Sequence, residues 1–400
     1  MKILSRSRSV NKLLCTVAVF IGCSASIVSL QAAPMLIPSP PAIAAKGYIL
    51  MDANSGKVII EKNADEPLEP ASLTKMMTAY VADYEIAQGN ISKSDQTKVS
   101  RNAWAQNKVF QGSSLMWLEA GKMVSVADLL KGVTISSGND ATIALAEHIA
   151  GSSHAFVDIM NQHAQLLGMK DTYFENPHGL PAPNHTTTAR DMATLAQAII
   201  RDFPEEYKLY AEKSFTYNGI KQPNRNKLLW RDPTVDGLKT GHTASAGFCL
   251  VASAKKDDMR LISVVMGANS DEARAQESQK LLSYGFRYYQ TLKLYSEGEV
   301  LVKHDVYSGE TDSVDLIAKD DVYVTVPRSQ REKVVAELDV EKYLQAPLKP
   351  SQVVGDIVVS LNDEVLSRQP ITVEQAVKEG GLFTRLWDFI ALFFIKLING

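Results

Sequence analysis

Residues 70–87, PASLTKMMTAYVADYEIA, combine a helix start with a chemically useful pair of side chains. Pro70 interrupts the preceding chain, and the spacing of the apolar residues after it predicts a helix that runs to about Ala87. Lys75 follows Ser72 by three residues, so both side chains should lie on one helix face, a turn apart. Taken alone, the pair is better explained as an ordinary helix N-cap and a solvated lysine.

Two further segments, Ser137-Gly138-Asn139 and Lys239-Thr240-Gly241, make the first one informative. Each is common by itself, since the Ser-x-x-Lys pattern also occurs at 9–12 and 253–256. Together the three segments supply a hydroxyl nucleophile, an amine to take its proton, a polar bridge and a cation for a carboxylate. They therefore predict a serine acyl-transfer enzyme whose base is lysine rather than histidine.

A lysine can act as a base near neutral pH only if burial or neighbouring cations lower the pKa of its amine. Leu73, Met76 and Met77 could bury Lys75, and Lys239 could be the neighbouring cation. The amide groups at the start of the helix would in addition favour negative charge that develops beside the serine.

The other two segments also have plain structural interpretations. Ser137-Gly138-Asn139 joins helical patterns at 126–133 and 140–150, where an ordinary turn is the simpler assignment. Lys239-Thr240-Gly241 opens a strand-like region that ends at Ala254, and its glycine allows a ligand to approach the edge of a sheet. A turn after Asp236-Gly237 would explain the same residues.

The whole chain has the composition of an ordinary globular protein. It has 400 residues, of which 45% are hydrophobic and 22% charged, and a net charge of −3, which gives no sign of nucleic-acid binding. No pattern resembles a zinc cluster, a phosphate loop or a dinucleotide fingerprint. We therefore expect no metal, no cofactor and no nucleic-acid partner, and the sequence does not indicate an oligomeric state.

Residues 1–33 resemble a secretory signal peptide. Positive residues precede an apolar stretch that runs from Leu13 to about Leu30, and Ala32-Ala33 would form the cleavage site. An uncleaved anchor is the alternative. After cleavage Cys249 is the only cysteine, so no intramolecular disulfide can form, and we expect a buried apolar residue rather than a nucleophile.

The mature chain divides into four predicted parts. Residues 34–46 are rich in Pro and Ala and form a linker. Residues 47–294 carry a hairpin at 48–60, further helical patterns at 154–167, 188–201 and 272–285, and strand-like runs at 247–254 and 260–267. This pattern predicts an α/β (α+β) domain with an antiparallel sheet flanked by helices. Residues 295–378 contain short strands and should form a small β-sandwich-like domain.

Residues 379–400 should form an amphipathic helix. On a helical wheel Arg385, Asp388, Lys396 and Asn399 share one narrow stripe, and the remaining surface is apolar and aromatic. About 17 residues are borderline for crossing a bilayer, and charges near its centre would be unfavourable. We therefore expect this helix to lie on a membrane surface; the alternative is that it packs on the protein itself.

The three segments, in this order, resemble those of penicillin-binding proteins and serine β-lactamases. The resemblance is closest to the low-molecular-mass D-alanyl-D-alanine carboxypeptidases, and it rests on residues 70–77, 136–141 and 235–243. It extends over nearly the whole chain, including the signal, the β-rich second domain and the amphipathic tail. It implies a β-lactamase/transpeptidase-like catalytic fold.

This resemblance implies a role for each site residue. Ser72 would be the acylated nucleophile and Lys75 its base, while Ser137 and Asn139 would assist proton transfer and hold the substrate. The implied substrate-binding residues are Lys239, Thr240, Gly241, His242 and Arg225. Of these, Lys239 and Thr240 would bind the terminal carboxylate, with Arg225 as a further candidate for that task. The backbone N–H groups of Ser72 and His242 would form an oxyanion hole.

The implied reaction removes the terminal D-alanine from a peptidoglycan pentapeptide stem, and β-lactams would acylate the same serine. The enzyme would be exported to the periplasmic face of the bacterial inner membrane. A β-lactamase or a peptidoglycan endopeptidase on the same scaffold are alternatives, although no Glu-x-x-Leu-Asn segment of one β-lactamase class is present. A wall-binding or β-lactam-sensing protein without activity is the non-enzymatic alternative.

Overall fold

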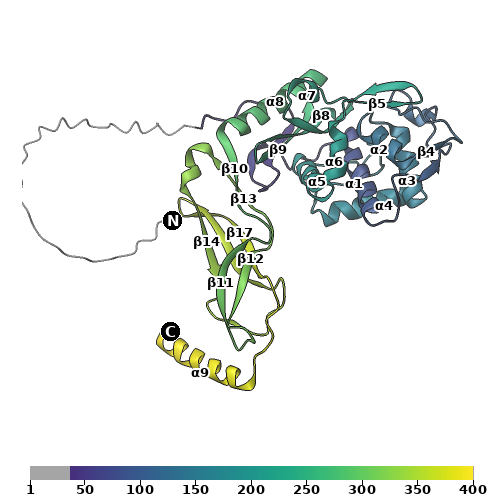
Figure 1. The fold of residues 1–400 in the computed structure, drawn as a ribbon. Coiled ribbons are helices and arrows are strands. Elements are labelled where there is room, and N and C mark those ends of the chain that lie inside the picture. Colours follow the sequence, from purple (N-terminus) through teal and green to yellow (C-terminus); the bar gives the residue numbers. More distant parts are fainter. Residues whose placement is uncertain (1–36, 400) are drawn as a thin grey trace, which may run out of the picture. The chain divides into compact units, whose positions relative to one another are not determined.

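The structure, a computed structural model, describes residues 37–399 (Figure 1). The predicted signal peptide, residues 1–33, lies outside the described residues, as does the beginning of the predicted linker. The described part of that linker has no helix or strand, but it packs on the protein. Ile43 is buried in an apolar cluster, and the Pro38 carbonyl accepts a hydrogen bond from the Tyr284 hydroxyl at 2.9 Å.

A five-stranded antiparallel sheet, the main sheet, has the strand order β2-β1-β9-β8-β7. Its strands are β1 (Gly47–Asp52), β2 (Val58–Lys62), β7 (Val235–Thr243), β8 (Gly247–Lys256) and β9 (Met259–Ala268). β1 and β2 form the predicted hairpin, and β8 and β9 correspond to the strands predicted at 247–254 and 260–267. Two short hairpins lie outside this sheet: β3 (Gln96–Lys98) with β4 (Met123–Ser125), and β5 (Ser214–Tyr217) with β6 (Ile220–Pro223).

Six helices of this part of the chain lie near their predicted positions: α1 (Lys75–Ala87), α2 (Val126–Thr134), α3 (Asn139–Ala150), α4 (Ser153–Leu166), α5 (Ala189–Asp202) and α8 (Asp271–Tyr288). Two short helices, α6 (Pro204–Tyr207) and α7 (Leu228–Arg231), were not predicted. Hydroxyl N-caps explain several of the starts, because Ser125, Ser152, Thr188 and Ser270 each accept a backbone N–H of the following first turn.

Side chains alternate along the central strands, so the main sheet has two apolar faces. Ile49 and Val251 pack in one core cluster with α1 and α5, whereas Leu50 and Leu250 pack in a second cluster with α8. Figure 1 shows α8 on one side of β8 and β9, with α1 and α5 on the other. The predicted antiparallel sheet flanked by helices is therefore confirmed.

The helix at Ser72 begins differently from the prediction. Residues Ala71–Thr74 form a 3-10 turn, η1, and α1 begins only at Lys75. A 3-10 turn has three residues per turn, so side chains at i and i+3 eclipse each other. This tighter start therefore places the Lys75 side chain more directly over Ser72 than a regular α-helix would.

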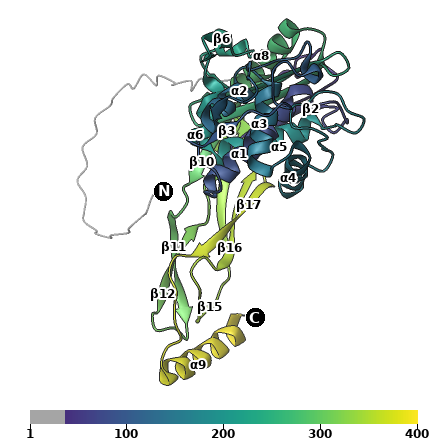
Figure 2. The same cartoon turned by 90° about the vertical axis from the view of Figure 1, so that its right-hand side faces the viewer.

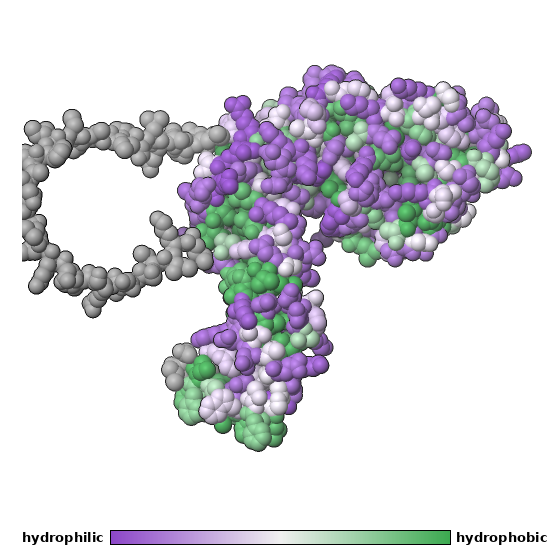
Figure 3. Space-filling model, viewed as in Figure 1, coloured by the Kyte–Doolittle hydropathy of each residue, from purple (hydrophilic) through white to green (hydrophobic). Residues whose placement is uncertain are grey.

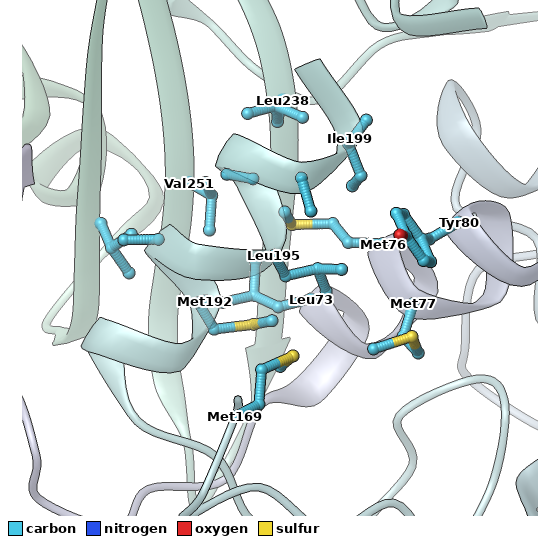
Figure 4. Close-up of a cluster of buried hydrophobic side chains, with 14 of the residues drawn as sticks. Leu73, Met76, Met77, Tyr80, Met169, Met192, Leu195, Ile199, Leu238 and Val251 are labelled. Carbon is cyan, nitrogen blue, oxygen red and sulfur yellow. The ribbon is translucent and has the colours of Figure 1, made fainter. Parts of the chain in front are cut away.

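The first turn of α1 is fixed by the core beneath it. In Figure 4, Leu73, Met76 and Met77 point into a cluster that also contains side chains of α5 and of the main sheet. The labelled partners on those elements are Met192, Leu195, Ile199, Leu238 and Val251. Burial of each large apolar side chain stabilises the fold by about 1.5–3 kcal/mol, so the position of η1 is set by packing.

We expect Met76→Ala to lower the free energy of unfolding by about 2–5 kcal/mol, because the deletion leaves a cavity in this cluster. Met76 is 0% exposed. Met123→Ala is the matched control, since Met123 is 55% exposed and its truncation should change stability by less than about 0.5 kcal/mol. Urea unfolding of both variants measures the difference, and equal effects would contradict the packing.

The chain from residue 289 onward is rich in strands (Figure 2). β10 (Tyr289–Tyr295) pairs with β13 (Val322–Pro327), and a second sheet has the order β14-β16-β17-β12-β11-β15. Its members are β11 (Val300–Tyr307), β12 (Ser313–Ala318), β14 (Val334–Val340), β15 (Leu344–Gln345), β16 (Val353–Leu361) and β17 (Glu364–Val373). The predicted boundary between residues 294 and 295 falls inside β10.

A buried carboxylate, that of Asp52, connects the part with the main sheet to the strand-rich part that begins at residue 289. Asp52, at the end of β1, accepts hydrogen bonds from the backbone N–H and hydroxyl of Ser55 and from the Thr291 hydroxyl. The Thr325 hydroxyl is 2.7 Å from that of Ser55 and 2.9 Å from that of Thr291. This chain of polar contacts ties the β1–β2 turn to the β10–β13 pair.

The last helix, α9 (Leu382–Asn399), confirms the predicted C-terminal helix. Asp388 accepts a hydrogen bond from the Ser308 backbone at 2.6 Å, and Arg385 forms an ion pair with Glu379. Leu392 is buried, whereas most of the aromatic surface of α9 is exposed, as Figure 3 shows. Within residues 37–399, no helix is long and apolar enough to cross a membrane.

Candidate active site

The three sequence segments meet in one cavity of about 640 Å³. Ser72 comes from η1, Ser137 from the turn between α2 and α3, Asn139 from the start of α3, and Thr240 and Gly241 from β7. The remaining lining residues are Gln111, Gly112, Ser113, Ser114, Gly179, Leu180, Asn224, Arg225, Lys227, His242, Thr243, Ala244, Phe248, Asp271 and Arg274. Residues far apart in the sequence therefore form one site.

The Lys75 amine lies at the centre of this arrangement. Its Nζ is 3.2 Å from the Ser72 hydroxyl oxygen, 2.6 Å from Oδ1 of Asn139 and 2.6 Å from the carbonyl oxygen of His178. The side chain is 1% exposed. The amine is thus held against the hydroxyl by two further acceptors, which is the geometry that a base for Ser72 requires.

Burial lowers the pKa of Lys75 to about 7, with a further lowering by the positive charge of Arg225 and an opposing effect of Asp140. Arg225 is thus a cation near Lys75 to which the sequence analysis did not give this role, and the expected neighbour Lys239 also interacts with Lys75. Lys239 is itself fully buried, and burial together with the charges of Lys75, Arg225 and Arg274 holds its pKa well below the usual value. Two neighbouring amines cannot both carry a charge easily in such a site.

The turn between α2 and α3 presents Ser137 and Asn139 to the two lysines. Ser137 has φ of +60°, and its hydroxyl accepts a hydrogen bond from Lys239 Nζ at 2.9 Å. Asn139 begins α3 and accepts from Lys75. Ser72, Lys75 and Asn139 thus form one hydrogen-bonded row, and Ser137 with Lys239 forms a second row in the same cavity.

Asp140, the residue after Asn139, holds the loop that forms another wall of the cavity. The Asp140 carboxylate accepts the backbone N–H groups of Met116 at 2.8 Å and Leu118 at 2.9 Å. The Asn139 backbone N–H in turn donates to the Ser114 carbonyl at 2.8 Å. Asp140 is fully buried, so its role is to hold the loop that contains Ser113 and Ser114 against the site.

The third segment lies in β7, at the edge of the main sheet. The strand-like region that was expected to end near Ala254 consists of two strands, because a turn at 244–246 separates β7 from β8. Gly241 runs so close to η1 that an added Cβ would lie 3.0 Å from the Pro70 carbonyl oxygen. A glycine here therefore lets the sheet edge pack closely against η1, whereas the sequence analysis associated it with the approach of a ligand.

A loop with two buried histidines supports η1 from the other side. Gly179 has φ of +85°, and a Cβ there would collide with the Ala71 carbonyl oxygen. Mainly through burial, with a smaller effect of Lys75, the pKa of His178 is lowered to about 3 and that of His185 to about 4. His185 Nδ1 accepts the Glu175 N–H, and its Nε2 is 2.7 Å from the Thr74 hydroxyl. Both rings are thus neutral parts of the scaffold.

The remaining sequence candidates lie as follows. Arg225 lines the cavity between Asn224 and Asn226, and the Asn226 side chain donates to the Gly237 carbonyl at 2.9 Å, which ties this segment to β7. The exposed His242 ring stacks on Phe248 with centroids 4.0 Å apart. Cys249 is buried, and burial raises the pKa of its thiol to about 11, so it is not a nucleophile.

Sequence reasoning missed Arg274 on α8. Its guanidinium donates to the Gly241 carbonyl at 2.9 Å, forms an ion pair with Asp271 and lies over the Phe248 ring. It therefore supports β7 at the third sequence segment, Lys239-Thr240-Gly241. The only local signal is the i, i+3 spacing of Asp271 and Arg274, which indicates a helix pair but not a contact with a distant strand.

Comparison with known proteins gives the same assignment for both parts of the chain. Residues 35–270 match the family model of D-alanyl-D-alanine carboxypeptidases, and residues 289–379 match that of the penicillin-binding protein 5 C-terminal domain. The chain is 49% identical over 357 residues to the D-alanyl-D-alanine carboxypeptidase DacC of Escherichia coli K12, an alignment that covers 88% of this chain and 89% of that protein. It is 46% identical to DacA of the same organism, over 90% of each chain.

Among solved structures, the chain is similar to penicillin-binding protein 5 from Haemophilus influenzae. The TM-score is 0.80 at 47% identity, and the match covers 86% of this chain and all of that one. The similarity therefore spans the main sheet with its helices as well as the strand-rich second part. The chain belongs to the family of D-alanyl-D-alanine carboxypeptidases, the low-molecular-mass penicillin-binding proteins.

Proposed function

We propose that this D-alanyl-D-alanine carboxypeptidase removes the terminal D-alanine of a peptidoglycan pentapeptide stem through an acyl-enzyme on Ser72. One observation carries the assignment of roles: the Lys75 amine is 3.2 Å from the Ser72 hydroxyl, and burial lowers the pKa of that amine to about 7. A substantial fraction of the lysine is therefore neutral at neutral pH. Such an amine can take the serine proton as the oxygen attacks.

The acylation step uses groups that are already in place. Lys75 accepts the proton from Ser72, whose oxygen attacks the carbonyl of the penultimate D-alanine. The backbone N–H groups of Ser72 and His242 stabilise the negative oxygen, a contribution worth about 3 kcal/mol for each donor. The proton then passes to the leaving nitrogen, for which Ser137 and Lys239 offer a second hydrogen-bonded route, and D-alanine departs. Water subsequently attacks the ester and releases the shortened stem.

Recognition of the terminal carboxylate falls to the cationic side of the cavity. Lys239 lies behind Ser137, Thr240 and Arg225 line the same wall, and Arg274 supports the strand. A carboxylate that arrived there would favour the charged form of Lys239, because an opposite charge raises the pKa of an amine. β-Lactams would enter the same site and acylate Ser72.

Ser72→Ala should abolish covalent labelling by a fluorescent penicillin and should also abolish release of D-alanine from a pentapeptide stem. Both reactions need the same oxygen. Ser94→Ala is the matched control, since Ser94 is exposed and does not line the cavity. This variant should be labelled by the penicillin and should release D-alanine at the normal rate. Gel fluorescence and an assay of free D-alanine measure the two outcomes. Persistent labelling of Ser72→Ala would place the nucleophile elsewhere.

The acylation rate should rise with pH through the pKa of Lys75, since only the neutral amine can accept the serine proton. Arg225→Gln removes a positive charge that disfavours protonation of Lys75, so the pKa should increase. The midpoint of the rising limb in the plot of rate against pH should therefore shift to higher pH by roughly one unit. Penicillin acylation rates between about pH 5 and 9 measure this limb.

Arg231→Gln provides the control for that shift, because Arg231 pairs with Glu272 on the surface and does not line the cavity. Its profile should match that of the unchanged protein. A profile of Arg225→Gln that keeps its midpoint, even with a reduced rate, would mean that Arg225 binds substrate without affecting the base.

We also infer that α9 binds a membrane surface and so holds the exported enzyme at the periplasmic face of the inner membrane. Phe383 is 88% and Trp387 73% exposed, a degree of exposure that is unfavourable for aromatic side chains in water. Arg385 forms an ion pair with Glu379, and Asp388 accepts a hydrogen bond from the Ser308 backbone, so both polar side chains contact the rest of the protein. The helix can thus place its aromatic surface in the lipid interface.

Phe383→Asp with Trp387→Asp should abolish cosedimentation of the full-length chain with phospholipid vesicles, because a charge in the apolar boundary opposes binding. D-alanine release from a soluble stem should be unchanged. Val353→Asp is the control, since Val353 is exposed on the strand-rich part and lies outside α9. If the double variant still sediments with vesicles, α9 is not the anchor.

The division of the chain remains a proposal of the same kind. We infer a catalytic domain at 47–294, a β-rich domain at 295–378 and an anchor at 379–400, preceded by an exported leader and a linker. The matched family ranges, 35–270 and 289–379, support two folded domains. The pairing of β10 with β13 favours a start of the second domain at β10.

A further inference from the structure

A second cavity, of about 230 Å³, lies between α1, α2 and the segment after α5. It shares no lining residue with the catalytic cavity. Two ionisable side chains that line it are more than nine-tenths buried: Asp83 from α1 and Tyr210 from the 3-10 turn η3 (Lys208–Ala211). The catalytic mechanism uses neither of them.

Asp83 is a buried acid without a partner. The side chain is 4% exposed, and it forms no hydrogen bond or ion pair with any residue from 37 to 399. Burial raises the pKa of Asp83 to about 8, with a further increase from the charge of Glu206 and an opposing effect of Lys93. A carboxyl group in such a position is normally paired.

Tyr210 is also unpaired. Its side chain is 1% exposed, and within the described chain its hydroxyl has no hydrogen-bond partner. Burial and the charge of Asp83 raise the pKa of this phenol well above its usual value, so it is a neutral hydroxyl that can donate a hydrogen bond and accept one. A buried polar group without a partner is unfavourable by about 1–3 kcal/mol. Two of them on one cavity indicate that a partner comes from outside the chain.

The charges on the wall indicate what that partner carries. Lys93 pairs with Glu206 at 2.7 Å and Lys208 with Glu205, so these charges offset one another. Lys131 lines the same cavity and has no acidic partner among the described residues. Glu212 is exposed at the rim. The lining of the cavity thus combines a buried acid and a buried phenol with a cation that has no acidic partner among the described residues.

We propose that this cavity binds a small zwitterionic α-amino acid, with the ammonium on Asp83 and Tyr210 and the carboxylate on Lys131. The volume is below the roughly 300 Å³ at which pockets for drug-sized ligands begin, which fits a ligand of this size. The choice of D-alanine as the probe rests on the carboxypeptidase activity, which releases that amino acid. The site itself is inferred from the residues that line it and does not depend on the carboxypeptidase activity.

Binding should displace a proton. The empty site holds Asp83 partly protonated at neutral pH, since its pKa is about 8, and an ammonium group favours the carboxylate form. The proton therefore leaves to the buffer as the ion pair forms. This gives a readout that a merely structural Asp83 would not produce.

The test is calorimetric titration of D-alanine into the full-length protein after a β-lactam has acylated Ser72 and filled the catalytic cavity. We expect one equivalent to bind at about pH 7, with a heat that depends on the ionisation enthalpy of the buffer. Asp83→Asn should weaken binding at least about tenfold and remove the buffer dependence. D-lactate, which lacks the ammonium, and D-alaninamide, which lacks the carboxylate, should both bind more weakly.

Lys131→Gln alters a side chain on the cavity wall, so it keeps the test informative if Asp83→Asn fails to fold. This variant should bind D-alanine more weakly and should bind D-alaninamide with unchanged affinity. Lys98→Gln, on exposed β3, is the matched control and should change nothing. Absence of binding to the acylated protein, or equal affinity in Asp83→Asn, would overturn the proposal. If the β-lactam fails to acylate Ser72, the proposed function fails instead, and the same titration can be run on Ser72→Ala.

Discussion

The structure depends on one constraint, the removal of the Lys75 amine from water beside a serine hydroxyl. A solvated lysine has a pKa of about 10.4 and would be charged at neutral pH, so it could not take a proton. Lys75 is buried, and Arg225 adds a repulsive charge. The acceptors Asn139 and His178 then hold the amine in place. The apolar cluster beneath η1 fixes the turn that carries Ser72, and the burial of Lys75 lowers the pKa of its amine.

The fold brings several cations together, and their mutual repulsion helps to lower the pKa of Lys75. Lys75, Lys239, Arg225 and Arg274 act on one another through the cavity, an arrangement that is unfavourable until an anion arrives. In the proposed function, a peptide with a terminal carboxylate supplies that anion. Asp140 limits the repulsion while it holds the Met116–Leu118 loop.

Much of the site could be predicted from the sequence, because its reactive groups lie in three short segments with characteristic spacing. The positions of six helices followed from helical spacing, whereas the short helices α6 and α7 and the close packing of Gly241 against η1 were not predicted. The 3-10 start at Ala71 could not be predicted, since it depends on a contact with Gly179 more than 100 residues away. Arg274, the role of Arg225 and the cavity at Asp83 also depend on tertiary neighbours that no local pattern specifies.

The central claim concerns the protonation of one amine, and direct titration tests it. The Nζ resonance of Lys75 can be followed by NMR in protein labelled with ¹⁵N-lysine and assigned through Lys75→Arg. The account predicts a midpoint near 7 in the unliganded enzyme. A midpoint close to the ordinary value of about 10.4 would contradict it, because the lysine would then be charged and could not act as the base for Ser72.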